Sequence, residues 1–453
     1  MSKTIAAIAT ALGEASIGVV RISGDDAIIV ADKVFRSVSG KTLAECQGYS
    51  ALFGYVEVDG EKIDEAVALV FLAPKSYTGE NVVELSVHGG SFVVRQVLRA
   101  VLDAGTIMAE RGEFTRRAFE NGKMSLNEAE SVMDIISADG EQALRASLSA
   151  KLGVLSQKCN VIRDKLTFAA ATVAAFSDFP DEEPEFSGID KLESMLGESE
   201  EELQKLLDTY DTGRMLRHGV NTVIVGPPNA GKSTLMNLLS GYERSIVTPI
   251  AGTTRDIVEE TVNLDGLVLK LSDTAGLRDT ADEVEQIGVK RAKERIDFAD
   301  LIIAVVDSSD VKPEEVKELY KTLVGRPAVV VFNKSDICFA DKSDVESLGL
   351  RFVEMSAKNG SGLVEFKTTI KEITKTNNLS GSADVFLNER QRDCVLRALE
   401  NVKESLSALQ CGLTVDAVGV LLDDALAALL ELTGERVTVE VANKVFEHFC
   451  VGK

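Results

Sequence analysis

The sequence predicts a multidomain protein in which an α+β domain is followed by an all-α helical domain, and an α/β domain is inserted into the helical one. Three observations predict this order. Residues 1–120 mix short apolar runs with turn signals, residues 125–217 and 387–450 carry apolar residues at helical spacing, and residues 222–376 alternate β-rich runs with helical stretches. At about 150 residues per domain, a chain of 453 residues is expected to hold about three domains.

The composition is that of a globular protein, because apolar residues make up 45% and charged residues 27% of the chain. The formal net charge of −23 repels phosphate backbones, so broad non-specific binding to nucleic acid is not expected. Apolar runs fall short of the roughly 20 residues that a membrane-spanning helix needs, and the six cysteines form no C-x-x-C pair. We therefore expect a cytoplasmic protein with no membrane partner, zinc site or disulfide framework.

In the first domain, predicted for residues 1–120, three apolar runs predict strands and one longer run predicts a helix. The helix is Phe92–Leu102, and the strands are Ile17–Ile22, Ala66–Leu72 and Val82–Val87. These elements are sufficient to give the domain a core of its own.

The helical domain is predicted for residues 121–217 and 378–453. Its apolar residues recur at helical spacing in two sets before the acidic break at Asp178–Pro184, and these sets are Leu126, Ala129, Val132, Met133 and Ile136, then Leu144, Leu148, Leu152 and Leu155. Insertion of another domain is feasible because the termini of a domain often lie close together. The alternative is two separate helical domains.

The inserted α/β domain is predicted for residues 218–377. Its β-rich runs alternate with helical stretches, which favours a parallel sheet with helices on both faces. The runs are Thr222–Val225, Val268–Leu271, Leu301–Val306, Ala328–Phe332 and Phe352–Met355.

A phosphate-binding loop follows the first of these strands. Residues Gly226–Ser233 match G-x-x-x-x-G-K-[ST] and precede a predicted helix at Thr234–Leu239. The glycines let backbone N–H groups turn towards a phosphate, and the helix N-terminus adds positive potential. Lys232 is expected to reach the β- and γ-phosphates, and Ser233 is expected to hold Mg²⁺. The predicted nucleotide contacts here are Asn229, Ala230, Gly231, Lys232, Ser233 and Thr234.

Two further loops predict a preference for guanine. Asn333, Lys334 and Asp336 form N-K-x-D after a strand, and the Asp336 carboxylate can accept hydrogen bonds from guanine N1–H and N2–H₂. Adenine has neither donor, so ATP would leave this carboxylate without a partner. Ser356, Ala357 and Lys358 follow the next strand and can offer a backbone N–H to the guanine O6.

The sequence between the phosphate loop and the guanine-binding loops contains two candidate switches. Asp273, Thr274, Ala275 and Gly276 end another strand, where Asp273 suits an outer-shell Mg²⁺ role and the Gly276 N–H can contact the γ-phosphate. In Gly252–Asp256, Thr254 is the candidate second Mg²⁺ ligand. Together with the phosphate loop and the guanine motifs, these are the elements of a Ras-like GTPase in sequence order.

Hydrolysis requires a group other than the usual glutamine, because Leu277 stands where Ras-type GTPases carry Gln. The Asn229 amide oxygen and loop carbonyls can hold a monovalent cation in place of an arginine finger. Glu283 and Glu285 can act through water as general acid or base. Spacing alone favours the alternative, in which both glutamates belong to a solvated acidic helix start.

The motifs together resemble the MnmE (TrmE) family of tRNA-modifying GTPases, within the TrmE-Era-EngA-YihA-Septin-like superfamily, over essentially the whole chain. The C-terminal C-[IVL]-G-K is the most specific match, because it has no general structural use after a helix. One departure is Ala11–Ser16, where many members carry a Gly/Arg-rich stretch, so contacts from that loop are not expected. Outside the GTPase motifs, the resemblance rests on Val20–Gly24, Tyr77–Glu80, His88–Gly90, Gly112–Thr115, Asp178–Glu183 and Phe449–Lys453.

The resemblance implies a folate-binding N-terminal domain that also forms a homodimer, and a G domain that meets its copy in a GTP- and K⁺-dependent way. It implies the FAD protein MnmG as partner in a heterotetramer, with tRNA bound mainly through the complex. The implied reaction adds a carboxymethylaminomethyl or aminomethyl group to C5 of the wobble uridine of certain tRNAs. The one-carbon donor is a tetrahydrofolate derivative, and 5,10-methylene- and 5-formyl-tetrahydrofolate are the expected ligands.

The resemblance also assigns residues by position. It implies Glu285 as the general acid or base of hydrolysis, Ser233 and Thr254 as Mg²⁺ ligands, and K⁺ ligands at Asn229, Thr248, Ile250 and Thr253. It places folate contacts at Arg21, Glu84, Lys123 and Lys453, with Cys450 close by as a candidate modification site. The GTP site then also includes Thr248, Pro249, Ile250, Ala251, Gly252, Thr253, Thr254, Asp273, Thr274, Ala275 and Gly276.

The alternative function is a regulatory GTP-binding protein of ribosome assembly without folate chemistry. Proteins of that class share the phosphate loop and the GTTRD element. They have no use for residues 1–120 or for the terminal Cys-Val-Gly-Lys, so binding of 5-formyltetrahydrofolate separates the two functions.

Overall fold

The computed structural model describes residues 3–138, 140–178, 186–242, 260–273, 296–309, 313–376, 387–411, 415–447 and 449–453. The chain divides into two compact units, one of residues 1–133 and 429–453 and one of residues 134–428. No helix within the described ranges combines the length and apolarity that crossing a membrane requires.

The first unit is built on a sheet that has seven strands in the described residues, in the order β3-β4-β5-β6-β2-β1-β7. The described neighbours are antiparallel except for β1 and β7, which run parallel. The three predicted strands are confirmed as β2, β5 and β6, whereas the other strands were not predicted. The strands are β1 (Ile5–Ile8), β2 (Ile17–Ser23), β3 (Phe35–Ser37), β4 (Ser50–Val58), β5 (Glu61–Phe71), β6 (Val82–His88) and β7 (Ile107–Met108).

Helices α1 (Ala27–Val34) and α2 (Ser91–Asp103) pack against one face of this sheet, and α2 confirms the predicted helix. Alternate residues of β6 share that core, among them Val83, Leu85 and Val87. Because side chains alternate along a strand, Glu84 lies on the opposite face. The unit also contains the 3-10 helix η1 (Leu43–Glu45), and α3 (Glu113–Glu120), α16 (Val439–Glu447) and α4 (Leu126–Ile136), of which α4 belongs to this unit up to Met133.

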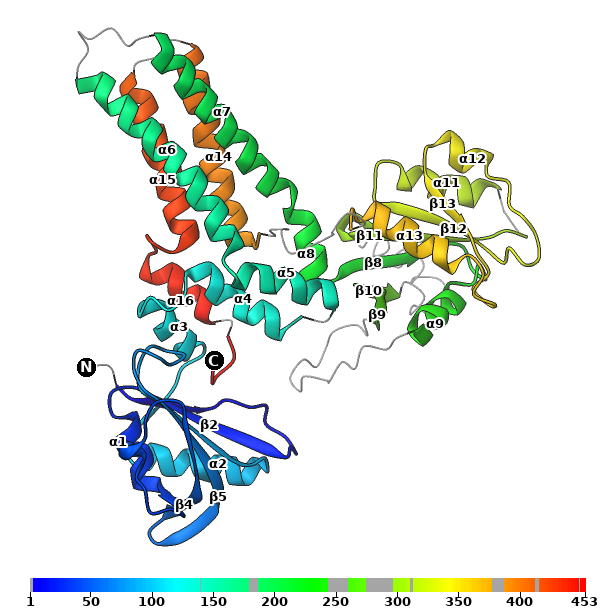
Figure 1. Cartoon of the computed structure of the whole chain (residues 1–453). Helices are drawn as coiled ribbons and strands as arrows, with labels where there is room; N and C mark the ends of the chain where they lie inside the picture. Colours follow the sequence, from blue (N-terminus) through cyan, green and yellow to red (C-terminus); the bar gives the residue numbers. More distant parts are fainter. Residues whose placement is uncertain are drawn as a thin grey trace, which may run out of the picture. The chain divides into compact units, whose positions relative to one another are not determined.

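The second unit contains a helical bundle, in which α6, α7, α14 and α15 run side by side (Figure 1). Lys165 of α6 reaches Glu198 of α7 at 2.9 Å, and Lys403 of α14 donates to Gln204 of α7 at 3.4 Å. Segments before and after the α/β region therefore form one bundle, and the alternative of two separate helical domains is wrong. The helices are α5 (Glu141–Lys151), α6 (Val154–Asp178), α7 (Phe186–Asp208), α8 (Tyr210–His218), α14 (Glu389–Gln410) and α15 (Val415–Thr433), of which α15 belongs to this unit up to Ala428.

The spacing of Leu144, Leu148 and Leu152 correctly predicted a helix, but these leucines do not form the buried face of that helix. Helix α5 ends at Lys151, and Gly153 has a φ of 76° between α5 and α6. Leu144, Leu148 and Leu152 are 39%, 43% and 72% exposed, because α5 packs through its smaller residues Ala143 and Ala146 instead.

The α/β region of this unit has a sheet of six strands in the described residues, in the order β13-β12-β11-β8-β10-β9. Its neighbours are parallel except for β9, which is antiparallel to β10. The five predicted strands and the parallel sheet are confirmed, and β9 was not predicted. The strands are β8 (Val220–Val225), β9 (Glu260–Leu264), β10 (Leu267–Asp273), β11 (Leu301–Asp307), β12 (Ala328–Asn333) and β13 (Arg351–Glu354).

Helices cover both faces of this sheet, as the alternation predicts. Helices α9 (Lys232–Tyr242) and α13 (Leu363–Ile373) contribute to one core, and α11 (Pro313–Leu323) and α12 (Ser343–Ser347) contribute to the other. The carboxyl ends of β8, β10, β11, β12 and β13 therefore meet at one edge, where the polar motifs of the sequence lie.

Candidate functional site

The phosphate loop joins the carboxyl end of β8 to the start of α9, as the motif requires. Gly226 has a φ of 146°, and a Cβ there would lie 2.1 Å from the Val305 carbonyl oxygen of β11. Gly231 has a φ of 92°, and a Cβ there would lie 2.2 Å from the Asn333 amide nitrogen. Only glycine fits at both positions, so the neighbouring strands determine the path of the loop backbone.

Lys232 and Ser233 open helix α9 beside this loop. The Lys232 ammonium donates to the carbonyl oxygens of Gly226 and Pro227, both at 2.9 Å, so its side chain lies across the loop. Ser233 is exposed in the first turn of the helix, where backbone N–H groups have no intrahelical acceptor. This arrangement suits a phosphate with a bound cation, and Asp273 ends β10 in register with Ile224 on β8.

Asn333 connects the phosphate loop to the loop after β13. Its amide nitrogen donates to the Ala230 carbonyl at 2.9 Å, and its amide oxygen accepts from the Ala357 N–H at 2.9 Å. The residue is 3% exposed, so both bonds are shielded from water. One side chain thus fixes the phosphate loop and the Ser-Ala-Lys loop relative to each other, a role that sequence reasoning missed.

Lys334 follows Asn333 with a left-handed φ of 63° and forms an ion pair with Asp307 at the end of β11. Burial favours the neutral acid, but hydrogen bonds from Lys334 and Ser309 outweigh it and hold the pKa of the Asp307 carboxyl below its ordinary value. Sequence reasoning also missed Asp307, although a carboxylate at the end of a fully apolar strand was a readable signal.

The remaining predicted nucleotide residues divide into three groups. Asp336 and Lys358 are exposed, whereas Ser356 is fully buried, and all three lie at the same edge of the sheet as Asn333. The backbone places Asp273 at that edge as well. The described residues do not include Thr248, Pro249, Ile250, Ala251, Gly252, Thr253, Thr254, Thr274, Ala275, Gly276 or Glu285.

In the first unit, Arg21 is the centre of a second polar cluster. Its Nε donates to Glu84 at 2.8 Å across the β2–β6 pair, and its Nη1 donates to the Gly452 carbonyl at 3.2 Å. The guanidinium carbon lies 5.5 Å from the ring centroids of both Tyr77 and Phe114. Two predicted folate contacts are therefore adjacent, beside aromatic surface.

The C-terminal residues complete this cluster. The Phe114 N–H donates to the Lys453 carbonyl at 3.2 Å, and a Cβ on Gly452, whose φ is 97°, would lie 2.2 Å from the Ile8 carbonyl oxygen. Burial lowers the pKa of the half-buried Lys453 ammonium, and the nearby Arg21 charge lowers it further. The predicted neighbour Cys450 is exposed.

Lys123, the fourth predicted folate contact, has different partners. Its ammonium donates to the Pro74 carbonyl at 3.1 Å, and its stem lies beside Gly79. It therefore contacts the loop that carries Tyr77. Glu80, in the same loop, forms an ion pair with the buried Arg117 at 3.0 Å, which holds the loop in place. The structure thus brings Arg21, Glu84 and Lys453 together, and Lys123 lies against the loop whose Tyr77 contacts Arg21.

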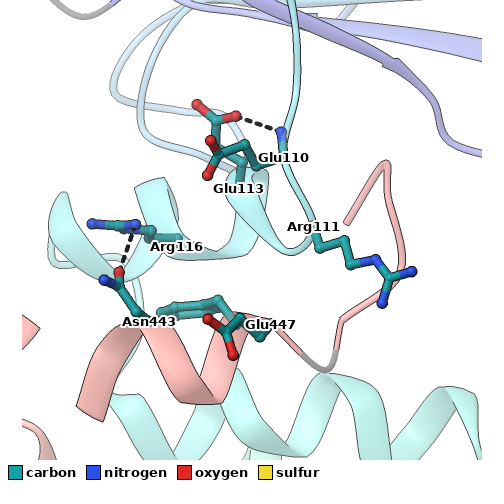
Figure 2. Close-up of a pocket in the computed structure, with 7 residues that line it drawn as sticks. Glu110, Arg111, Glu113, Arg116, Asn443 and Glu447 are labelled. Carbon is teal, nitrogen blue, oxygen red and sulfur yellow. Dashed lines mark hydrogen bonds between the residues drawn. The ribbon is translucent and has the colours of Figure 1, made fainter. Parts of the chain in front are cut away.

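A cavity of about 260 Å³ lies between α3 and α16 of the same unit (Figure 2). Arg116 donates to Asn443 at 3.0 Å, and the Glu113 carboxylate accepts the Glu110 N–H at 2.7 Å. No predicted site residue lines it; the lining is Glu110, Arg111, Glu113, Arg116, Asn443, Phe446 and Glu447. Within the described ranges, no group of three or more His, Cys, Asp or Glu residues is placed to hold a metal ion.

The α/β region and its motifs define the class of P-loop GTPases. The phosphate loop lies between β8 and α9, and Asn333 ties it to the guanine-type loops at the same sheet edge. The order of motifs along the chain agrees with this class.

Comparisons with known proteins identify the family within that class. The protein-family model described as GTP-binding protein TrmE N-terminus matches residues 4–123, and the protein-family model described as MnmE helical domain matches residues 126–450. The chain therefore belongs to the MnmE (TrmE) family of tRNA modification GTPases.

Curated relatives of this name match the whole chain. The tRNA modification GTPase MnmE of Clostridioides difficile is 39% identical over 99% of both chains, and that of Geobacter sulfurreducens is 40% identical over 99% of both. That of Symbiobacterium thermophilum is 40% identical over 100% of this chain and 99% of its own. A solved Era variant from Aquifex aeolicus bound to GDP and AlF₄⁻ is 28% identical over 40% of this chain and 66% of that one, with a TM-score of 0.27.

Proposed function

We propose that this chain is a K⁺-activated, dimerisation-dependent GTPase that acts with MnmG to add a carboxymethylaminomethyl or aminomethyl group to C5 of the wobble uridine of certain tRNAs. A tetrahydrofolate derivative supplies the one-carbon unit. The observation that carries the proposal is that one chain holds both the GTPase loops and the Arg21–Glu84–Lys453 cluster. A purely regulatory GTPase has no use for the second site.

In the G domain, the positions of the described nucleotide-site residues support the following roles. The start of α9 and the Lys232 ammonium bind the β- and γ-phosphates, and Asp336 selects guanine. Ser233, with Thr254, would hold Mg²⁺, which neutralises charge on the phosphates. The exposed Asn229, with Thr248, Ile250 and Thr253, would hold K⁺, and Glu285 is assigned the acid or base role.

The cluster in the first unit fits a folate. A pterin has N–H donors for the Glu84 carboxylate, and the Tyr77 and Phe114 rings offer apolar surface beside the Arg21 charge. The half-buried Lys453 and the more distant Lys123 supply cationic contacts for an anionic folate tail. The chain's own contribution is to bind and orient the folate and to shield it from water.

The decisive experiment is nucleoside analysis of wobble uridine in tRNA incubated with this protein, MnmG, GTP and the folate, with each component omitted in turn. Modification that requires this protein and the folate supports the proposal. Titration with 5-formyltetrahydrofolate adds a binding test, in which Glu84→Gln should weaken binding and Glu110→Gln, outside the cluster, should not. Absence of folate binding and of modification would favour a regulatory GTPase.

The cation requirement has a separate test. Replacing Na⁺ by K⁺ should raise GTP turnover by at least about 10-fold, since a positioned cation takes the place of an arginine finger. Asn229→Ala should remove most of that difference. Equal turnover in the two salts would exclude K⁺ activation.

A further inference from the structure

Asp307 ends the central strand β11 at the sheet edge where the nucleotide motifs lie. It is in register with Asn333 at the end of β12 and is 8% exposed. Its Oδ1 accepts hydrogen bonds from the backbone N–H and the hydroxyl of Ser309, at 2.9 and 2.7 Å. Its Oδ2 forms the ion pair with the Lys334 ammonium. One oxygen therefore fixes the carboxylate, and the other holds the lysine.

Lys334 is restrained at both ends of its side chain. Its backbone has a φ of 63°, which is uncommon for a residue with a side chain, and its carbonyl accepts the Ile337 N–H at 2.9 Å in the turn that carries Asp336. Because Asp307 holds the ammonium, the four-carbon stem has few positions left. Along the chain, Lys334 stands between Asn333, which is tied to the phosphate loop, and the guanine-selecting Asp336.

We propose that Asp307 is a positioning residue for guanine nucleotide binding, because it fixes the Lys334 side chain beside the base before the nucleotide arrives. The inference rests on the proposed GTPase function. A free lysine would lose rotamer freedom when the nucleotide ordered it, whereas the Asp307 ion pair has already removed that freedom. Asp307 acts through Lys334 and does not itself contact the substrate.

Asp307→Asn is the informative variant, since it keeps the shape and an acceptor for Ser309 but removes the charge. We expect the dissociation constant of fluorescently labelled GDP to rise by about 3-fold to 10-fold, the cost of ordering one long side chain on binding. Unchanged affinity would overturn the proposal.

Asp300→Asn is the matched control. Asp300 directly precedes β11, is 9% exposed, and pairs with Arg214 of α8 at the opposite edge of the sheet. Both variants remove a buried carboxylate beside the same strand, so both should lower the unfolding temperature. Only Asp307→Asn should weaken GDP binding, and an equal loss in the control would mean that the effect is structural.

Two further measurements separate positioning from a general loosening of the loop. In a Lys334→Met background, Asp307→Asn should cause no additional loss, because its target is absent. Asp307→Asn should weaken the binding of GDP and of IDP by the same factor, because IDP differs from GDP only in lacking the amino group that Asp336 is proposed to bind. A larger loss for GDP, or full additivity with Lys334→Met, would contradict the proposal.

Ser309→Ala covers the case in which Asp307→Asn does not fold. It leaves the carboxylate in place and removes one bond that orients it, so about a 2-fold loss of GDP affinity is expected, again absent with Lys334→Met. No loss would overturn the proposal. If the wild-type protein does not bind GDP, the proposed GTPase function fails; if it binds GDP and these variants bind equally well, only this inference fails.

Discussion

Asn333→Ala tests whether one buried amide holds the nucleotide edge together. The change removes two hydrogen bonds of 2.9 Å and leaves the Ala230 carbonyl and the Ala357 N–H without their partner in a region where Asn333 is 3% exposed. Each buried group left unsatisfied costs about 1–3 kcal/mol, so the two groups together cost about 2–6 kcal/mol, and we expect a loss of local stability in the lower part of this range, about 2–4 kcal/mol. Water that enters the space left by the amide would bring the loss towards the lower value.

Hydrogen exchange followed by mass spectrometry suits this prediction, because it reads local opening within a chain of two units. A loss of about 2–4 kcal/mol corresponds to exchange about 30-fold to 1,000-fold faster in peptides from β8 and β12, and GDP affinity should fall with it. Asn359→Ala is the control, since Asn359 is exposed and its amide oxygen accepts the Ser361 N–H at 3.0 Å. If Asn333→Ala and the control change exchange equally, the bridge does not carry the stability of the edge.

Other substitutions test other parts of the fold. Gly231→Ala should abolish measurable GDP binding, because the new Cβ would lie 2.2 Å from the Asn333 amide nitrogen; binding close to that of the wild type in a titration would refute this packing. Arg117→Met should destabilise the first unit by about 3–5 kcal/mol in urea unfolding, since it leaves two carboxylates without their shared cation, and a loss below about 1 kcal/mol would contradict it. The hydrogen bond that the His88 ring donates to the Asp64 carboxylate raises the pKa of His88. The stabilisation from this pair is therefore complete below about pH 6.5 and is lost as pH rises through the raised pKa, and an NMR titration should show that this pKa falls in Asp64→Asn.

The local sequence pattern was sufficient to predict the strands that are buried on both faces of the sheet. Strand β11 reads as an unbroken apolar run and is buried throughout, so its sequence alone identifies it. The edge strands β7 and β9 are short or mixed in character, because neighbours rather than their own residues hold them in the sheet. The alternation from strand to helix then gave the parallel sheet.

The candidate sites divide in a similar way. The phosphate loop was predictable because its glycines, lysine and serine fall within one short motif. The close approach of Val305 to Gly226 and of Asn333 to Gly231 gives the packing reason for the glycines. The partners of Asn333 and Asp307 depend on which strands lie side by side, so a local pattern marks the Asp307 carboxylate but does not show what it contacts. The cluster around Arg21 was reached through the family resemblance, since its bond to Gly452 joins residues separated by 431 positions. Domain limits and the individual site roles stay predictions.

That separation has a consequence for how the protein is made. At about 5–20 residues per second, a ribosome needs roughly 20–90 s to add the 431 residues between Arg21 and Gly452. During that interval the first sheet can form, but the Phe114 N–H has no Lys453 carbonyl to meet and Arg21 lacks its Gly452 partner. The folding of this unit is therefore completed only after Gly452 has been made, and a nascent chain stalled before Gly452 leaves the exit tunnel would carry a folded sheet with an unfinished cluster.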